Sequence, residues 1–174
     1  MPTLTFRDHA DGGDLDAVLA MNQADVSHLS GLTAASLERL ARSAAYFRIA
    51  QLDGRDAGFL LVLSPETSYE SDNFQWFKQR YARFLYVDRV VVAPHARREG
   101  IASRLYEDLE IYAGSTDASL IACEINLRPA NPGSVAFHER RGFVEVGTQE
   151  TEHGTKTVSM RIKSLGASAR RSLR

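Results

Sequence analysis

The chain has 174 residues, of which 44% are hydrophobic and 25% charged, a composition that suits one globular domain with a sizeable core. Its net charge of −1 excludes a global positive field of the kind that draws proteins to nucleic acid or acidic membranes. The single cysteine, Cys123, excludes an intramolecular disulfide, and five histidines without ligand spacing leave no metal site to expect. Because the sequence has no window of about 18 apolar residues and no secretion signal, we expect a cytoplasmic protein without a membrane span.

The first part of the chain predicts a strand, two helices and a β-hairpin, over residues 3–7, 14–22, 33–43, 46–52 and 57–63. Asp14 is a candidate N-cap for the first helix, and Thr33 begins the second. Asp53-Gly54 separates the two hairpin strands, and this dipeptide is typical of a tight turn because both residues tolerate positive φ.

The segment from Ser64 to Arg83 is polar yet rich in aromatic residues, and it is long for a simple connection between strands. Long loops in compact domains usually cover or line a binding site, so we expect this loop to help select a ligand. The equally weighted alternative is that its aromatic side chains only cover the edge of the core.

The second part of the chain predicts a strand that ends at Val92, a helix over 102–113, a strand over 119–124, a helix over 131–140 and a hairpin of 144–147 and 158–162. The crossover through the helix at 102–113 should make the strands at Val90 and Ile121 parallel neighbours. We therefore predict one α/β domain over residues 1–163 with a mixed, mostly antiparallel sheet, and a flexible basic tail over 164–174.

A turn suited to an anion follows the most strand-like run of the chain. Val90-Val91-Val92 stops at Ala93-Pro94, and Arg97-Arg98-Glu99-Gly100 then leads into the helix through Ile101-Ala102-Ser103. The first amides of a helix lack intrahelical partners and the dipole is positive there, so such a turn can bind phosphate. The alternative is a stabilising connection with two solvated arginines. A nucleotide-binding loop is disfavoured because neither of its glycine-rich motifs occurs.

The pattern Arg97-x-x-Gly100-x-Ala102 after a Val-rich strand resembles motif A of the GNAT acetyltransferase superfamily, which holds the pyrophosphate of acetyl-coenzyme A. A second segment, from Asn131 to Gly142-Phe143, resembles the family's other signature. The resemblance covers the chain from Leu4 to Ile162 and implies a GNAT-like sheet with helices on both faces and a splayed parallel strand pair. The cofactor-binding residues that it implies are Val90, Val91, Val92, Arg97, Arg98, Glu99, Gly100, Ile101, Ala102, Ser103, Asn131, Ser134, Phe137 and His138.

The resemblance implies direct transfer of an acetyl group from acetyl-coenzyme A to a primary amine, which needs a base for the amine and a proton for the departing thiolate. Asp88 and Glu124 are the candidate bases, and for Asp88 the alternative is a structural salt bridge with Arg89 or another basic residue. His138 stands where many relatives carry the tyrosine that protonates the thiolate. It is the candidate donor, and the alternative is a half-exposed histidine that only packs or hydrogen-bonds near the sulfur of the cofactor.

Two other function classes remain open. A catalytically impaired module could keep the acyl-coenzyme A cleft and act as a sensor, and the histidine at position 138 favours that alternative. Nucleic-acid binding depends only on the arginines of the tail and is disfavoured. The acceptor amine stays unidentified, and we expect that the chain could form a homodimer.

Overall fold

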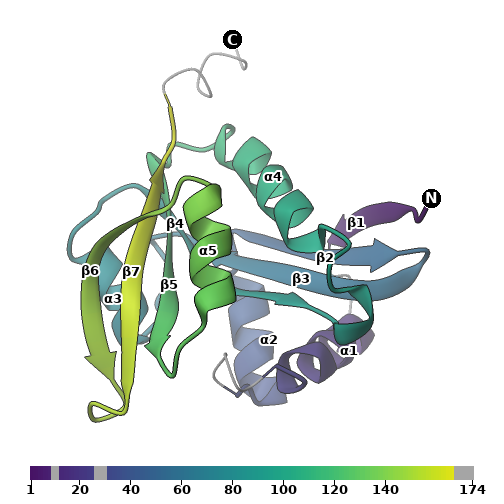
Figure 1. Ribbon diagram of the computed structural model, residues 1–174, viewed down its shortest axis with the longest axis horizontal. Coiled ribbons are helices and arrows are strands. Elements are labelled where there is room, and N and C mark those ends of the chain that lie inside the picture. Colours follow the sequence, from purple (N-terminus) through teal and green to yellow (C-terminus); the bar gives the residue numbers. More distant parts are fainter. Residues whose placement is uncertain (9–11, 26–30, 167–174) are drawn as a thin grey trace. The chain divides into compact units, whose positions relative to one another are not determined.

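The computed structural model describes residues 1–8, 12–25 and 31–166 (Figure 1). Its elements are β1 (Leu4–Asp8), α1 (Gly12–Gln23), α2 (Ala34–Ser43), β2 (Tyr46–Leu52), β3 (Arg55–Leu63), α3 (Asp72–Lys78), β4 (Phe84–Val92), the 3₁₀ helix η1 (Pro94–Ala96), α4 (Ile101–Ala113), β5 (Leu120–Arg128), α5 (Pro132–Arg140), β6 (Val144–Thr151) and β7 (Lys156–Ser164). Within these residues the strands form a seven-stranded sheet of order β1-β2-β3-β4-β5-β7-β6. The predicted mixed, mostly antiparallel fold class is confirmed.

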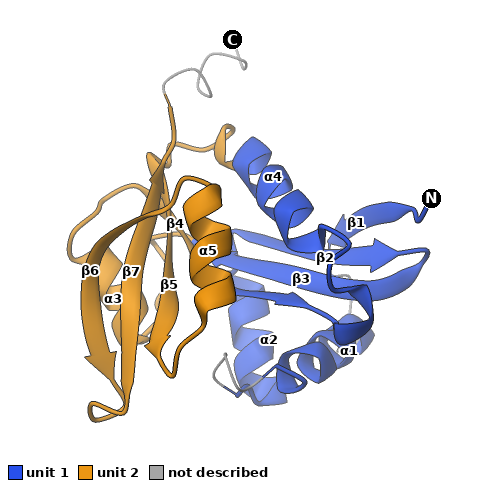
Figure 2. Ribbon diagram, viewed as in Figure 1, with its two compact units in different colours: residues 1–63, 87–112 blue, residues 64–86, 113–174 orange. Residues whose placement is uncertain are grey.

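Two compact units divide these elements (Figure 2). Unit 1 comprises residues 1–63 and 87–112, and unit 2 comprises residues 64–86 and 113–174. Strand β4 therefore gives its first residues to unit 2 and the rest to unit 1. The single domain over residues 1–163 stays a prediction. Among the helices of the described residues, none is long and apolar enough to cross a membrane.

Unit 1 is built on the β2–β3 hairpin. The turn residues Asp53 and Gly54 have φ of 51° and 77°, as the Asp-Gly signal predicts. Thr33 caps α2 in a capping box, and Leu37, Leu40 and Ala41 bury the inner face of that helix. The predicted N-cap of the first helix is wrong, because α1 already begins at Gly12 and Asp14 lies in its first turn. There the Asp14 carboxylate lies 2.6 Å from the guanidinium of Arg7.

Unit 2 is built on β5, β7 and β6, which pair antiparallel in that order. Phe84, Leu85 and Tyr86 of β4 pair with Leu120, Ile121 and Ala122 of β5 in parallel, which confirms the predicted parallel neighbours. β5 continues to Arg128, beyond the predicted end at Glu124. The predicted tail begins too early, because Ser164 pairs with Leu120 and the Leu165 N–H donates to the Ser119 carbonyl. The rest of that tail, residues 167–174, lies outside the described residues.

The segment 64–83 of unit 2 is not a continuous loop, because it contains α3. The Ser71 side chain caps this helix by accepting the Phe74 N–H at 3.5 Å. Phe74 and Phe77, three residues apart, give the helix one apolar face and are both 0% exposed. Trp76 packs against β6, where a Cβ at Gly147 would lie 2.7 Å from its ring. Phe74 and Phe77 therefore belong to the core of unit 2, whereas Tyr69, Trp76 and Tyr81 are half-buried, and a role of this segment in ligand selection stays a prediction.

Candidate functional site

The predicted phosphate turn lies in unit 1, between β4 and α4. The Ala93 N–H donates to the Ala57 carbonyl at 2.8 Å, so β3 holds the point where β4 ends. Arg98 and Gly100 follow with φ of 68° and 72°, both in the left-handed region. For arginine this backbone conformation costs about 1 kcal/mol or more, so the turn stores strain that its surroundings maintain. α4 begins directly after it, with the Arg104 N–H donating to the Gly100 carbonyl at 3.1 Å.

The turn is open and positively charged. A Cβ at Gly100 would have no neighbouring atom within 4 Å, so the backbone there is accessible to a ligand. Arg97, Arg98 and Glu99 are exposed, whereas Ile101 is buried at 1% exposure and anchors the start of α4. The Arg97 guanidinium lies 3.7 Å from the Asp25 carboxylate, a long and solvent-screened ion pair that leaves most of its charge available.

The other predicted cofactor residues of unit 1 lie on either side of this turn, in β4 before it and in α4 after it. Val90 and Val92 are half-buried on one face of β4, and Val91 is buried on the other. Ala102 and Ser103 are half-buried in the first turn of α4. The predicted diphosphate-binding residues thus form one continuous strand–turn–helix segment, as the sequence pattern indicates.

Asp88 belongs to a buried polar group at the middle of β4. Its carboxylate accepts a hydrogen bond from Arg89 Nε at 2.7 Å, and the two side chains are 3% and 4% exposed. Arg89 also donates to the Asn22 side chain of α1 at 2.8 Å, and Asn22 is 0% exposed. This ion pair is the structural salt bridge with Arg89 that we named as the alternative to a catalytic role for Asp88. Asp88 as the base stays a prediction.

Glu124 lies in unit 2 beside Tyr86. The Tyr86 hydroxyl donates toward both carboxylate oxygens of Glu124, at 2.9 and 2.8 Å. Tyr86 is 0% exposed, whereas Glu124 is half-buried. Sequence reasoning did not pair these residues, because their contact depends on the register of β4 and β5. Parallel strands that align Tyr86 with Ala122 place Glu124 two residues further along the same face.

The second predicted motif forms α5 of unit 2 and the residues around it. Asn131 is the N-cap and accepts the Ser134 N–H at 3.4 Å. His138 is 4% exposed, and its Nδ1 lies 2.7 Å from the Ser134 carbonyl oxygen and 3.3 Å from the Ser134 hydroxyl. The imidazole packs edge-on against Phe137 and Phe143, with centroid distances of 5.1 and 5.2 Å.

Burial is the main cause that lowers the pKa of His138, while the bond to the Ser134 carbonyl opposes it. His138 is therefore a neutral imidazole at pH 7, with a proton on Nδ1 that it donates to that carbonyl. Both remaining motif residues, Ser134 and Phe137, are half-buried and lie on the same helix.

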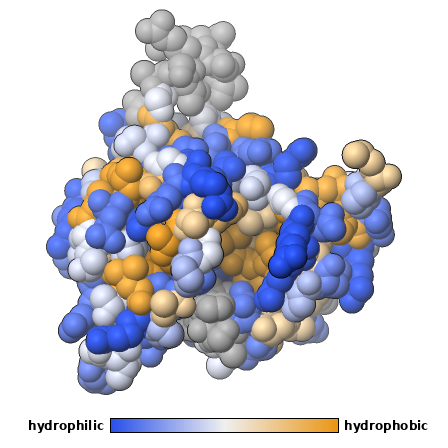
Figure 3. Space-filling model, in the orientation of Figure 1, coloured by the Kyte–Doolittle hydropathy of each residue, from blue (hydrophilic) through white to orange (hydrophobic). Residues whose placement is uncertain are grey.

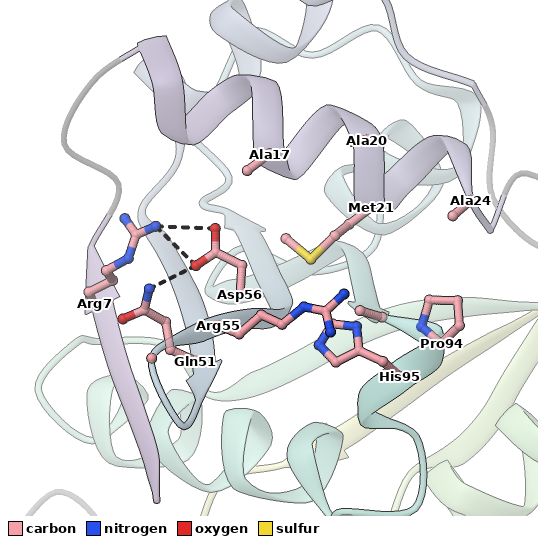
Figure 4. Close-up of a pocket in the computed structure, with 12 residues that line it drawn as sticks. Arg7, Ala17, Ala20, Met21, Ala24, Gln51, Arg55, Asp56, Pro94 and His95 are labelled. Carbon is pink, nitrogen blue, oxygen red and sulfur yellow. Dashed lines mark hydrogen bonds and ion pairs between the residues drawn. The ribbon is translucent and has the colours of Figure 1, made fainter.

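Unit 1 also holds a pocket that the sequence did not indicate (Figure 4). Its volume is about 550 Å³, and Ala17, Ala20, Met21 and Ala24 of α1 form its apolar wall. On the opposite side Asp56 accepts hydrogen bonds from Arg7 and Gln51, so that carboxylate is already satisfied. Arg55 and His95 complete the lining. On the visible face of the molecule, hydrophobic patches lie among hydrophilic residues (Figure 3).

Comparison with known families places most of the chain in one of them. The model of the acetyltransferase (GNAT) domain family matches residues 31–164. That range includes the phosphate turn, Glu124 and the whole of α5. A comparison with curated proteins finds no match.

Solved structures share the fold at low sequence identity. Ard1 from Thermoplasma volcanium has a TM-score of 0.76 and 15% identity, over 94% of this chain and 98% of that chain. The ribosomal-protein-S18-alanine N-acetyltransferase from Escherichia coli has a TM-score of 0.69 and 14% identity, over 94% and 95%. The yncA protein from Salmonella typhimurium, a structure with its cofactor acetyl-CoA, has a TM-score of 0.68 and 16% identity, over 94% and 95%.

Proposed function

We propose that this chain, which belongs to the GNAT acetyltransferase family and is an acyltransferase, moves an acetyl group from acetyl-coenzyme A to a primary amine. The observation that carries the proposal is the turn between β4 and α4. Its left-handed Arg98 and Gly100, its open backbone and its exposed arginines suit a diphosphate at a helix N-terminus.

Each part of the proposed site has a physical task. The turn and the start of α4 bind the diphosphate of the donor. The backbone of Val90–Val92 supplies hydrogen-bonding groups near the thioester, where donors stabilise the oxyanion of the tetrahedral intermediate. Asn131, Ser134 and Phe137 line the pantetheine arm. No covalent enzyme intermediate is required, which agrees with a thiol at Cys123 whose pKa burial raises.

We assign the base to Glu124 rather than to Asp88, because Glu124 is half-buried and Asp88 is enclosed with Arg89. His138 keeps the proposed role of proton donor to the thiolate. Since its pKa is lowered, only a minority of molecules carry the donating imidazolium at neutral pH, and that fraction grows as the pH falls.

Calorimetric titration of the purified protein with acetyl-coenzyme A and with coenzyme A tests the donor site. We expect both ligands to bind, and we expect Gly100→Glu to abolish binding because it fills the open space and adds like charge. Gly31→Glu is the matched control, since Gly31 is also exposed with open space around a Cβ. Absence of uptake by the unmodified protein would refute the proposal.

A sensor module without transfer activity is the second candidate, and the buried histidine at position 138 favours it. Thiol release on addition of a broad panel of primary amines separates the two. Release supports the transferase, whereas thermal stabilisation by acetyl-coenzyme A without any release supports the sensor. The cytoplasmic location, the homodimer and the exclusion of nucleic acid as a partner stay predictions.

A further inference from the structure

We infer that Tyr86 is a positioning residue for Glu124, holding its carboxylate in the orientation in which it accepts the proton of the attacking amine. The inference rests on the proposed function. It adds a residue that acts through the base and does not itself touch the substrate.

The geometry of unit 2 builds the pair from two parallel strands. Tyr86 pairs with Ala122, and Glu124 follows two residues later, so both side chains stand on the same face. One hydroxyl proton is shared between two carboxylate oxygens at 2.9 and 2.8 Å. Hydrogen bonds to an ionised group are the stronger class, and a shared donor fixes the plane of the carboxylate as well as its position.

The Tyr86 side chain is held in place by the packing around it. It is 0% exposed, and its ring lies edge-on to Phe74 at a centroid distance of 5.3 Å and against Phe77 at 5.9 Å. Both phenylalanines come from α3 and are fully buried. The buried tyrosine thus acts as a rigid support, while the half-buried Glu124 can still be reached from solvent.

Tyr86 orients the Glu124 carboxylate and does not make it a stronger base. Hydrogen bonds donated to a carboxylate favour its ionised form, so they make it a weaker base. Without the Tyr86 hydroxyl the Glu124 carboxylate loses a contact that fixes its plane, so more of its side-chain rotamers become accessible and fewer of them point at the amine. Holding a catalytic group in one orientation accounts for about tenfold or more in rate, because a displacement of about 1 Å can cost 10²-fold.

The transfer forms a carbon–nitrogen bond and breaks a carbon–sulfur bond. The amine lone pair forms a bond to the acetyl carbonyl carbon, and the carbon–sulfur bond breaks with its electron pair remaining on sulfur. The proton on the former amine nitrogen passes to a Glu124 carboxylate oxygen. The coenzyme A thiolate takes a proton from the donor proposed above or from water, and Glu124 later releases its proton to solvent.

Tyr86→Phe tests the inference because it removes one hydroxyl and keeps the ring among Phe74 and Phe77. Thiol release is followed with the most active amine of the panel, or as acetyl-coenzyme A hydrolysis. We expect kcat to fall about tenfold or more while KM for acetyl-coenzyme A changes less than about twofold. Tyr46→Phe is the matched control. Its hydroxyl donates to Asp108 at 2.7 Å in unit 1, and we expect kcat and KM to stay unchanged.

A double-mutant cycle separates positioning from a structural effect. Glu124→Gln should lower kcat at least as much as Tyr86→Phe, and Tyr86→Phe should then add almost nothing in that background. Additive losses would overturn the inference. If Tyr86→Phe fails to fold, Glu124→Asp draws the carboxylate away from the hydroxyl by one methylene. An unchanged kcat in Glu124→Asp would overturn it as well.

The same measurements distinguish the two proposals. If the unmodified protein neither binds acetyl-coenzyme A nor releases thiol, the proposed function fails and the inference fails with it. If it binds and turns over while Tyr86→Phe keeps full kcat, only the inference fails. Binding with turnover, a kcat loss confined to Tyr86→Phe and non-additivity with Glu124→Gln would support both.

Discussion

Gly58 of β3 is a position where one added methyl group should disturb both the stability of unit 1 and the phosphate turn. A Cβ built there lies 2.5 Å from the Val91 carbonyl oxygen, and 3.4 Å from both Ile101 Cγ2 and Val92 Cα. Real Cβ atoms essentially never approach other atoms to under 3.0 Å. Reaching an ordinary contact of 3.4 Å from 2.5 Å requires a displacement of about 0.9 Å, and the atom that must move is backbone.

We therefore expect Gly58→Ala to lower the free energy of unfolding by about 2 kcal/mol, within the range for overpacked interiors. For a chain of this size that corresponds to a fall in Tm of about 4–8 °C. Because Val91 and Ile101 flank the phosphate turn, the same displacement should weaken acetyl-coenzyme A binding about tenfold.

Scanning calorimetry and isothermal titration of Gly58→Ala measure the two effects. Gly31→Ala is the control, since a Cβ there meets nothing within 4 Å. Gly58→Ala could instead match the control in both Tm and affinity for acetyl-coenzyme A. That result would show that β3 and β4 can move apart without loss of folding free energy, and it would refute the reasoning from close backbone approach.

Three further predictions concern His138 of the second motif and Cys123 of the core. His138→Phe keeps an aromatic ring against Phe137 and Phe143 but removes the ring nitrogens. It should slow transfer while the affinity for acetyl-coenzyme A stays within a few fold. Full activity would remove His138 from the mechanism. The lowered pKa of His138 means that the unfolded chain binds a proton at higher pH than the folded one. Folded stability from this group is therefore present above about pH 6.5 and is lost as the pH falls below that value. Thermal melts should show a smaller loss from pH 7.5 to 5 in His138→Phe than in the unmodified protein, and parallel curves would contradict this. Cys123, at 3% exposure with its pKa raised mainly by burial, should react with a thiol reagent only after unfolding, so rapid labelling of the native protein would contradict its placement.

The sequence was sufficient for the turn between β4 and α4 because its signals are local. A β-branched run that favours a strand, Pro94 that fixes φ and Gly100 that permits a left-handed conformation follow one another within a few residues, so each signal acts locally. The Asp53-Gly54 hairpin and the Thr33 cap were predicted correctly for the same reason. The helix α3 was missed, because Pro65 and many polar residues surround the two phenylalanines that define its buried face.

The candidate site was harder to predict because its contacts join distant parts of the chain. Arg89 donates a hydrogen bond to Asn22, which lies 67 residues away in the sequence, and no sequence pattern around either residue predicts that bond. Tyr86 and Glu124 are 38 residues apart, so their contact follows only once the parallel register of β4 and β5 is known. A sequence therefore indicates which residue types are available for chemistry, while the partners of Asp88 and Glu124 are set by tertiary structure.

The left-handed Arg98 and Gly100 give the β4–α4 turn its shape. A turn that grips the diphosphate contacts a part of the molecule that the donor and the spent carrier have in common. The binding free energy from this contact is the same for acetyl-coenzyme A and for coenzyme A. It therefore does not lower the activation barrier of the transfer step. Such an enzyme would be inhibited by its own by-product, because coenzyme A competes with acetyl-coenzyme A for the same turn.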